Sequence, residues 1–483
     1  MGKRSTPGPQ ERRFAAYVEG LAEAAGHADR NLPLKNYCTG LLLPGERKSI
    51  EPMAARLAHD NVERMHQSLH HLVADAPWSD EAVLDRCLES VIPAMLRQEP
   101  VVAWVVDDTG FPKKGRESVG VARQYCGQVG KQDNCRVAVS LSVATERASM
   151  PVAFRLYLPA SWVEDRKRRK KTGVPKSIQF QTKPEIALEQ IRRAQQQGLP
   201  QGVVLADAGY GTDTKFRTEL TKLKMTYVVG IQSTTTVWKP GEEPQPAQVR
   251  KGNAGRPRKL LQRHAKCQPV SVKDLAFSLA TEVWKKVSWR QGVKQKLQSR
   301  FAAMRVRPAH RDYWRSEPHP EQWLLIEWPA GESEPTKYWL STVPADIGLV
   351  ELVHLAKHRW IIERDYQELK QELGLGHYEG RGWRGFHHHA HLVYCGLWIP
   401  GGRTESFFPL SPRQQSWTTS DRAAARLPAA RFAAFVPSGI IRVPSRRSEW
   451  PSPAACSPEF LNVPFADRAR ADPRRQYPHP RHK

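Results

Sequence analysis

One apolar run that ends in a carboxylate constrains the fold of this chain more than any other feature of its sequence. Val203 to Ala206 are followed directly by Asp207, and a Gly-Tyr-Gly turn over 209–211 leads into a helical pattern. A short, fully apolar run closed by glycine is typical of a strand that is buried on both faces. Open α/β sheets place their sites at the carboxyl ends of such strands. We therefore expect Asp207 to end a central strand and to be a functional carboxylate.

A second apolar run, over 101–106, ends in a pair of carboxylates, Asp107 and Asp108. Strand and helix patterns follow it and continue past Asp207 in the order β-β-β-α-β-α-β. This order predicts an α/β fold with a ribonuclease H-like mixed sheet and flanking helices, in which the first and fourth strands are neighbours. The predicted strands and helices, in this order, are 101–110, 135–145, 152–159, 183–197, 203–206, 216–223 and 226–232.

Neighbouring first and fourth strands would bring Asp207 close to one of the two adjacent aspartates. Carboxylates held that close cannot all stay ionised unless cations neutralise them. Oxygen ligands favour Mg²⁺ or Mn²⁺, so we expect a divalent metal site at this edge of the sheet. Successive strand residues point to opposite faces, so only one of Asp107 and Asp108 is expected to reach the metal.

A long helical pattern from 346 to 373 carries a third acidic residue. Arg359, Glu363 and Lys370 lie on one face of it, since separations of four and seven residues nearly complete whole turns. An ordinary surface ion pair between Arg359 and Glu363 would explain the same spacing. The place of this helix, directly after the predicted sheet, favours a role for Glu363 beside the aspartates.

These residues resemble a known family. Arg359, Glu363 and Lys370, with three and six residues between them, look like the Y-(2)-R-(3)-E-(6)-K signature of bacterial insertion-sequence DDE transposases. The stretches DDTGFPKKG (107–115) and ADAGYG (206–211) are similar to the family's other two motif regions. Three motifs in the right order are far more specific than any one of them alone.

The resemblance implies a metal-dependent enzyme that cleaves DNA at the ends of an insertion sequence and joins them to a target by cut and paste. It implies Asp108, Asp207 and Glu363 as catalytic residues and as ligands of two Mg²⁺ or Mn²⁺ ions. Asp107 is the alternative first acid. The sequence departs from the signature at one position, because its tyrosine falls at Ala356.

Several basic residues are expected to contact double-stranded DNA, both at the transposon ends and at the target. Two of them match the basic positions of the signature, and two follow the first acid closely. The last two belong to a Gly-Arg-Pro-Arg sequence that resembles the core of an AT-hook, which enters a narrow minor groove. These residues are Arg359, Lys370, Lys113, Lys114, Arg256 and Arg258. A homodimer is expected in the DNA complex.

The charge of the whole chain agrees with a polyanionic partner. Its 74 Lys and Arg against 49 Asp and Glu give a formal net charge of +25, and such an excess gains free energy by displacing counterions from phosphates. No apolar run approaches the roughly 18 residues of a membrane span, and no signal peptide is recognisable. We expect a cytoplasmic, nucleoid-associated protein without a membrane partner. A decayed copy that only binds DNA is the alternative.

Three further stretches invite interpretation. The basic run over 165–173 is interpreted as a loop that contacts phosphates. The HHHAH sequence over 387–391 has no cysteine or carboxylate beside it to complete a zinc site, and it is interpreted as part of a basic helix that faces DNA. From 397 onward prolines recur and periodicity is lost, which suggests a disordered tail or, as we prefer, a frameshift that replaced a C-terminal helix.

The expected organisation has six parts. They are a disordered segment over 1–12, a helical and possible DNA-binding domain over 13–97, the first part of the ribonuclease H-like core over 98–232, a basic and β-rich insertion over 233–330, the second part of the core with the glutamate helix over 331–396, and an irregular Pro/Arg-rich tail over 397–483.

Overall fold

A mixed sheet runs through the computed structural model, which describes residues 8–246, 259–263, 267–292 and 295–398. Its strand order within these residues is β2-β3-β1-β5-β6-β12-β11-β10-β7-β8, with β4 also paired to β3 and β9 to β10. The strands are β1 (Ala103–Pro112), β2 (Ala122–Cys126), β3 (Lys131–Ala144), β4 (Ser149–Leu156), β5 (Val203–Ala206), β6 (Tyr227–Ile231), β7 (Thr236–Trp238), β8 (Val270–Ser271), β9 (Lys285–Gln291), β10 (Lys296–Pro308), β11 (Gln322–Trp328) and β12 (Lys337–Ser341).

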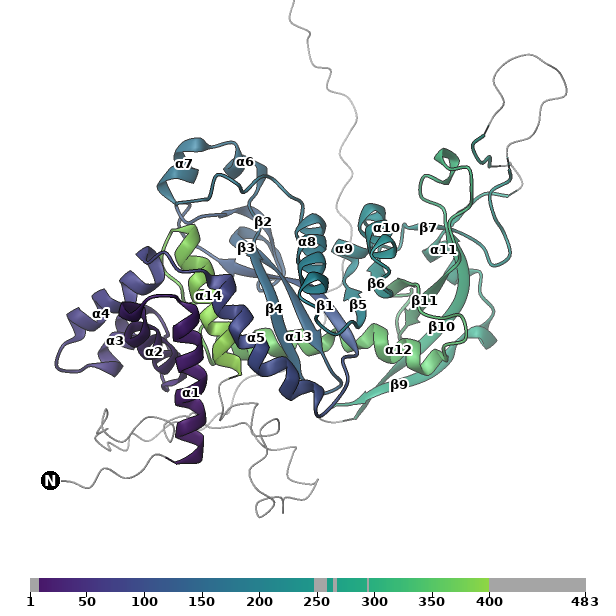
Figure 1. Cartoon of the computed structure of the whole chain (residues 1–483). Helices are drawn as coiled ribbons and strands as arrows, with labels where there is room; N and C mark the ends of the chain where they lie inside the picture. The colour runs from purple at the N-terminus through teal and green to yellow at the C-terminus, as the bar shows by residue number, and fades with distance from the viewer. Residues whose placement is uncertain (1–7, 247–258, 264–266, 293–294, 399–483) are drawn as a thin grey trace, which may run out of the picture. The chain divides into compact units, whose positions relative to one another are not determined.

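Helices cover both faces of the sheet and form a separate group around α14 (Figure 1). They are α1 (Pro9–Ala24), α2 (Ala28–Leu42), α3 (Ile50–Leu57), α4 (Val62–His70), the π-helix η1 (His71–Asp75), α5 (Asp80–Leu96), α6 (Ala160–Val163), α7 (Arg166–Lys171), α8 (Lys183–Gln196), α9 (Ala208–Gly211), α10 (Thr214–Lys222), α11 (Val272–Phe277), the 3₁₀-helices η2 (Thr281–Val283) and η3 (Asp312–Trp314), α12 (Leu349–His358), α13 (Trp360–Gln371) and α14 (Trp383–Leu397). None of these helices has the length and apolar character that crossing a membrane requires.

The centre of the sheet has the predicted topology. Strand β1 is antiparallel to β3 and parallel to β5, so the first strand and the strand that precedes Asp207 are neighbours. Helix α8 begins with a capping box, in which Thr182 and Glu185 bond each other's backbone. The ribonuclease H-like α/β fold expected from the sequence is therefore confirmed.

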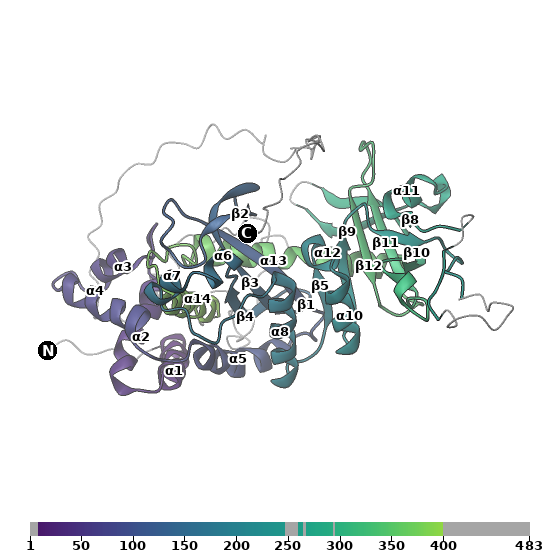
Figure 2. The same cartoon turned by 90° about the horizontal axis from the view of Figure 1, so that it is seen from above.

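The segment between β6 and α12 extends the same sheet. Strand β12 pairs antiparallel with β6, joining Tyr338 to Ile231, so β12 returns the chain to the main sheet. Strands β9, β10 and β11 continue outward from β12, and with α11 they lie together beyond α12 in Figure 2. An apolar core of its own, which includes Val272, Val306 and Leu324, holds this region together.

Three local expectations differ from the structure. Helix α1 begins at Pro9, inside the segment expected to be disordered, because Glu11 accepts a hydrogen bond from the Gly8 N–H at 2.9 Å. The basic run is the helix α7 and not a loop, since Asp165 caps its first turn. The glutamate helix is divided into α12 and α13 at Arg359. The expected tail lies outside the described residues from 399 onward.

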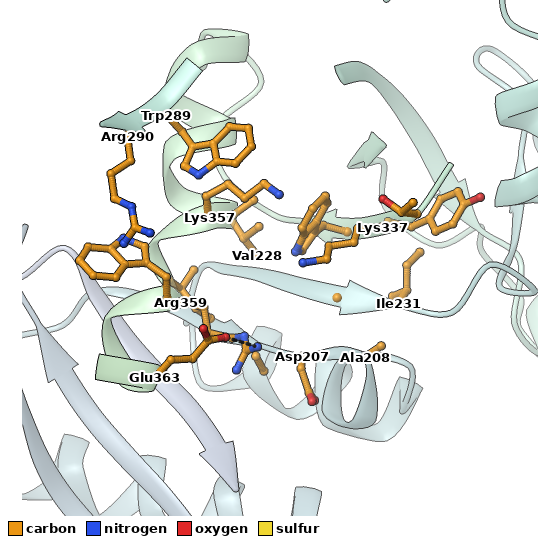
Figure 3. Close-up of a pocket in the computed structure, with 18 residues that line it drawn as sticks. Asp207, Ala208, Val228, Ile231, Trp289, Arg290, Lys337, Lys357, Arg359 and Glu363 are labelled. Carbon is orange, nitrogen blue, oxygen red and sulfur yellow. Dashed lines mark ion pairs between the residues drawn. The ribbon is translucent and has the colours of Figure 1, made fainter. Parts of the chain in front are cut away.

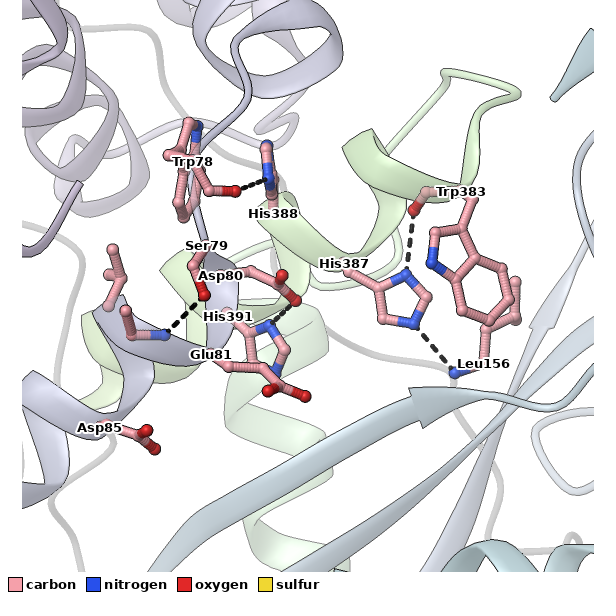
Figure 4. A network of polar contacts seen from close by, with 12 residues as sticks. Trp78, Ser79, Asp80, Glu81, Asp85, Leu156, Trp383, His387, His388 and His391 are labelled. Carbon is pink, nitrogen blue, oxygen red and sulfur yellow. Dashed lines mark hydrogen bonds and ion pairs between the residues drawn. The ribbon is translucent and has the colours of Figure 1, made fainter. Parts of the chain in front are cut away.

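The histidines of α14 are buried, so the expectation of a helix that faces DNA is wrong. The helix packs between β4 and the helices α2, η1 and α5. His387 accepts a hydrogen bond from the Leu156 N–H at 3.2 Å, and the His391 Nδ1 lies 2.6 Å from an oxygen of Asp80. His388 stacks on Trp78 with ring centroids 3.7 Å apart (Figure 4). These side chains join the N-terminal helices to the sheet.

We expect this junction to lose stability in acid. Burial lowers the pKa of His387, His388 and His389 to about 4, whereas the pKa of an unfolded histidine is about 6.5. The folded pKa is the lower one, so the stabilisation is complete above pH ~6.5 and is lost as pH falls towards 4. Above pH ~6.5 each histidine contributes up to about 3 kcal/mol to the free energy of unfolding. Asp80 acts in the same direction at still lower pH. Burial by itself would raise its pKa, but His391, with His387 and His388, together lower it.

Urea unfolding at pH 7 and pH 5 measures this loss, and we expect the free energy of unfolding to fall by several kcal/mol. The His389→Gln variant should lose less between the two pH values, since Gln does not titrate. His59 is exposed, and His59→Gln is the matched control that should behave like the parent chain. Equal stability of the parent chain at both pH values would show that these histidines do not couple protonation to folding.

Candidate active site

The register of the central strands places Asp107 and Asp207 on the same face of the sheet. Strand β1 pairs in parallel with β5, and Val105 lies opposite Leu205. Both side chains belong to the core under α12 and α13. Two residues further along each strand come Asp107 and Asp207, and a step of two returns to the same face.

The two adjacent aspartates face opposite sides. Asp107 lies opposite Ser140, whose hydroxyl contacts Tyr366 of α13 at 2.5 Å. Asp108 points to the other face, where the Lys183 Nζ at the start of α8 donates to its Oδ2 at 2.8 Å. The sequence-based assignment placed Asp108 first and Asp107 second. The structure brings Asp107, and not Asp108, to the face that carries α13.

Arg359 joins two of the acidic side chains. Its Nη1 donates to the Asp107 Oδ2 at 2.7 Å. Its Nη2 lies 3.5 Å from the Glu363 Oε1, an ion pair that Figure 3 shows. Burial alone would lower the pKa of this guanidinium, but Asp107, followed by Asp207 and Glu363, raises it. The predicted i,i+4 pair between Arg359 and Glu363 is therefore part of a larger cluster of charges.

Asp107 is the most strongly perturbed carboxylate of the cluster. Burial raises its pKa to about 7, with Arg359 opposing this shift and Asp108 and Asp207 adding to it. Its side chain is 14% exposed, whereas that of Glu363 is 68% exposed. A carboxylate in such surroundings is stabilised in its ionised form by additional positive charge.

A close backbone approach fixes the position of Asp207. The Asp207 side chain accepts a hydrogen bond from the Gly209 N–H at 2.9 Å and so caps the short helix α9. On the neighbouring strand β6, a Cβ atom at Gly230 would lie 2.8 Å from the Ala208 nitrogen. Only glycine permits this approach, so Gly230 is a positioning residue that the sequence analysis missed.

A cavity of about 460 Å³ opens beside these residues. Asp207, Arg359 and Glu363 line it together with aromatic side chains of the insertion and of α13 (Figure 3). Ala356, where the family signature has tyrosine, also lines the cavity. The smaller side chain at this position leaves room within the site.

The donor set fits a divalent ion of the kind expected. Asp107, Asp207 and Glu363 offer carboxylate oxygens alone, which suit Mg²⁺ or Mn²⁺. Among the described residues no three acidic, histidine or cysteine side chains are close enough to hold a metal as they stand. Asp107 and Glu363 instead pair with the Arg359 guanidinium, whose positive charge Asp207 also feels. The Glu363 side chain is 68% exposed.

The residues expected to contact DNA differ in their solvent exposure and in the hydrogen bonds that they already make. The Lys370 Nζ donates to the Gly110 carbonyl at 3.0 Å and to the Gln128 side chain at 3.2 Å. Lys113 donates to the Tyr378 carbonyl at 2.9 Å, and burial lowers its pKa to about 8. Lys114 is exposed. The last two expected contacts, Arg256 and Arg258, lie outside the described residues.

Lys183 is a further residue that sequence reasoning did not find. It stands at the first position of α8, and a basic residue there carries no signal of its own in the sequence. Its ion pair with Asp108 leaves that carboxylate 25% exposed. Each of the two adjacent aspartates thus has its own cation, from a different helix and on a different face of the sheet.

A mixed sheet in this strand order, with acidic residues in the middle of β1, directly after β5 and on α13, defines the ribonuclease H-like class. The family model described as "DDE superfamily endonuclease" matches residues 20–296, which is more than half of the chain. This chain therefore belongs to the DDE superfamily endonuclease family, as the sequence motifs predicted. The matched region contains both adjacent aspartates and Asp207, and it ends before α13.

A curated relative carries a more specific name. Over 189 residues the chain is 33% identical to a protein of Microchaete diplosiphon called "Probable transposase for insertion sequence element IS701". The match covers 39% of this chain and 45% of the relative. The chain thus matches a little under half the length of the curated relative.

Proposed function

We propose that this chain is the transposase of a bacterial insertion sequence, which cleaves DNA at the ends of the element and joins them to target DNA by cut and paste. Family membership and the name of the relative support a transposase. The observation that carries the proposal is the cluster in which Arg359 contacts Asp107 and Glu363 beside Asp207. Double-stranded DNA is the proposed substrate, and a homodimer its proposed assembly on DNA.

We propose Asp107, Asp207 and Glu363 as the ligands of two Mg²⁺ or Mn²⁺ ions. Such ions activate a hydroxyl nucleophile and stabilise the leaving oxygen of an in-line phosphoryl transfer. Asp107 must lose its proton to become a ligand, so binding is expected to strengthen as pH rises through about 7. Asp108, the first choice from the sequence, would have to leave Lys183 and turn to the opposite face.

Arg359 has a second role in this scheme. Its guanidinium contacts Asp107 and Glu363 in the described state. When those carboxylates turn to other cations, the guanidinium is free to bind a phosphate next to the scissile bond, for which its planar fork is suited. Lys370, tethered to β1 through the Gly110 carbonyl, would contact a neighbouring phosphate. The chain's own side chains thus position the DNA strand.

The test is cleavage of a duplex that carries the sequence flanking the gene. The purified chain is incubated with this DNA in Mg²⁺ or Mn²⁺ and, in parallel, in EDTA. We expect strand breaks that leave a 3′-hydroxyl with either ion and none in EDTA. Breaks that persist in EDTA would rule out the metal-dependent scheme. Binding without cleavage under all conditions would favour the second candidate, a DNA-binding protein that has lost catalysis.

A further inference from the structure

The helix α7 separates its basic side chains into two groups. Arg168 and Arg169 turn inward and anchor the helix. The Arg168 guanidinium lies 3.6 Å from the ring centroid of Trp162, and its Nη2 donates to the Arg116 carbonyl at 3.0 Å. Arg169 donates to three carbonyls at 2.8–3.3 Å, those of Val163, Pro175 and Ile178. These two arginines are structural.

The other four basic residues of α7 point outward. At about 100° per residue, they fall within an arc of about 140° on the helix, and all four are exposed. They are Arg166, Lys167, Lys170 and Lys171. Among the described residues one ion pair is found on this face, between Lys171 and Glu117 at 2.8 Å.

Such a face does not stabilise the folded chain. Like charges one turn apart repel each other, and a helix of six residues is too short to be stable without its anchors. The anchored helix nevertheless places these four cations on one face. Such an array of repelling cations is explained by a partner that supplies the missing negative charge.

Two more exposed cations belong to the same surface. The loop after β1 contributes Arg116, whose carbonyl contacts α7. The segment before α14 contributes Arg381, which together with Lys171 and Arg168 lowers the pKa of Glu117. We call these six exposed residues the α7 surface; they are Arg116, Arg166, Lys167, Lys170, Lys171 and Arg381. Helices α6 and α7 lie next to β2 (Figure 1). The Trp162 side chain donates to the carbonyl of Val121, directly before β2.

We propose that the α7 surface binds the phosphate backbone of the target duplex, an inference that rests on the proposed transposase function. Lys and Arg contacts to phosphates position a duplex without reading its sequence. The outward face of α7 offers cationic side chains alone, which are the usual partners of phosphate oxygens. We assign this surface to the target duplex because phosphate contacts are enough to hold a target, whereas the ends of an element must also be recognised by their bases. The loop over 113–121 continues directly from β1, so the surface is tethered to the strand that carries Asp107.

The test compares two variants with the same change in charge. The first replaces Arg166, Lys167, Lys170 and Lys171 with Gln. The control replaces four exposed lysines with Gln. They belong to α10, to the turn that follows it and to the segment after β7, and they are Lys215, Lys222, Lys224 and Lys239. Thermal unfolding of both variants establishes that they fold like the parent chain.

Binding to a random-sequence duplex is measured from low to high salt. Each lost phosphate contact reduces the slope of log K against log salt by about 0.9, so four lost contacts reduce it by about 3.6. We expect this reduction in the α7 variant and a slope in the control close to that of the parent chain. Equal reductions in both variants, or none in the α7 variant, would overturn the proposal.

A second readout distinguishes target DNA from element ends. The α7 variant should still cleave a duplex that carries an element end but should join that end to target DNA at least tenfold more slowly. Equal losses in cleavage and joining would overturn the assignment to the target. A third outcome is that the parent chain cleaves no DNA although the α7 variant shows the reduced salt dependence of DNA binding. In that case the transposase proposal fails, and the α7 surface binds DNA in a protein with another function.

Discussion

Replacing Asp207 with asparagine is expected to slow metal-dependent strand cleavage by at least about a thousandfold, while DNA binding is retained. A metal ion contributes several kcal/mol of transition-state stabilisation, and each 1.36 kcal/mol is a factor of ten in rate. Asparagine removes a charged ligand, yet it caps a helix as well as aspartate does. The bond from the Gly209 N–H to position 207 should therefore persist, and the fold with it.

The chain supplies a matched control for this substitution. Asp213 also caps a helix, accepting hydrogen bonds from the Lys215 and Phe216 N–H groups. Asp213→Asn should leave the cleavage rate within a few-fold of the parent chain. If both variants lose activity equally, the effect belongs to helix capping, and Asp207 has no special role in the reaction.

The same assay distinguishes the two adjacent aspartates. Asp107→Asn should be as inactive as Asp207→Asn, because the two side chains share a face of the sheet. Asp108→Asn should retain much more activity, since its carboxylate is paired with Lys183 on the other face. The reverse order of the two rates would return the first acid to Asp108 and would require the middle of β1 to turn over when DNA binds.

Replacing Lys357 with alanine is expected to lower the free energy of unfolding by about 3–5 kcal/mol, as for other broken buried ion pairs. The Lys357 ammonium contacts Glu327 of β11, and the two side chains are only 12% and 6% exposed. It also lies 4.4 Å from the ring centroid of Trp289. The substitution leaves the Glu327 carboxylate buried without this partner at the junction of α12 with the insertion.

Urea unfolding measures this loss, and a double variant tests its cause. Adding Glu327→Met to Lys357→Ala removes the buried charge and should restore a large part of the stability. Lys337→Ala is the control, because Lys337 is exposed on the neighbouring strand. If the double variant is no more stable than Lys357→Ala, loss of packing and not the unpaired carboxylate causes the effect.

Much of the fold could be predicted because its signals are local. The apolar run over 203–206 matches β5 at both ends, and the capping box at Thr182 marks the start of α8. Glu363 lies on the expected helix, close to Arg359. These features depend on residues near one another in the chain, where periodicity and capping determine structure.

The choice between Asp107 and Asp108 could not be made from the sequence. It depends on the register of β1 against β3 and β5, and a shift of one residue exchanges the two faces. Family resemblance favoured the aspartate that precedes threonine. The contact between Ser140 and Tyr366, more than two hundred residues apart, shows which face carries α13.

The basic run and the histidines were misinterpreted for a related reason. The local sequence predicts a loop for the basic run and solvent exposure for the histidines, but tertiary contacts override both preferences. Trp162 and Asp165 turn the basic run into the anchored helix α7. His387 and His388 are buried because backbone groups of other elements complete their hydrogen bonds.

A crystal of the protein soaked in Mn²⁺ tests the central claim most directly, because anomalous scattering locates the ion independently of any assay. We predict Mn²⁺ bound by Asp107, Asp207 and Glu363, with the Arg359 side chain turned away from Asp107. An ion held by Asp108 in place of Lys183, or no ion between Asp107 of β1 and Asp207 after β5, would contradict the account.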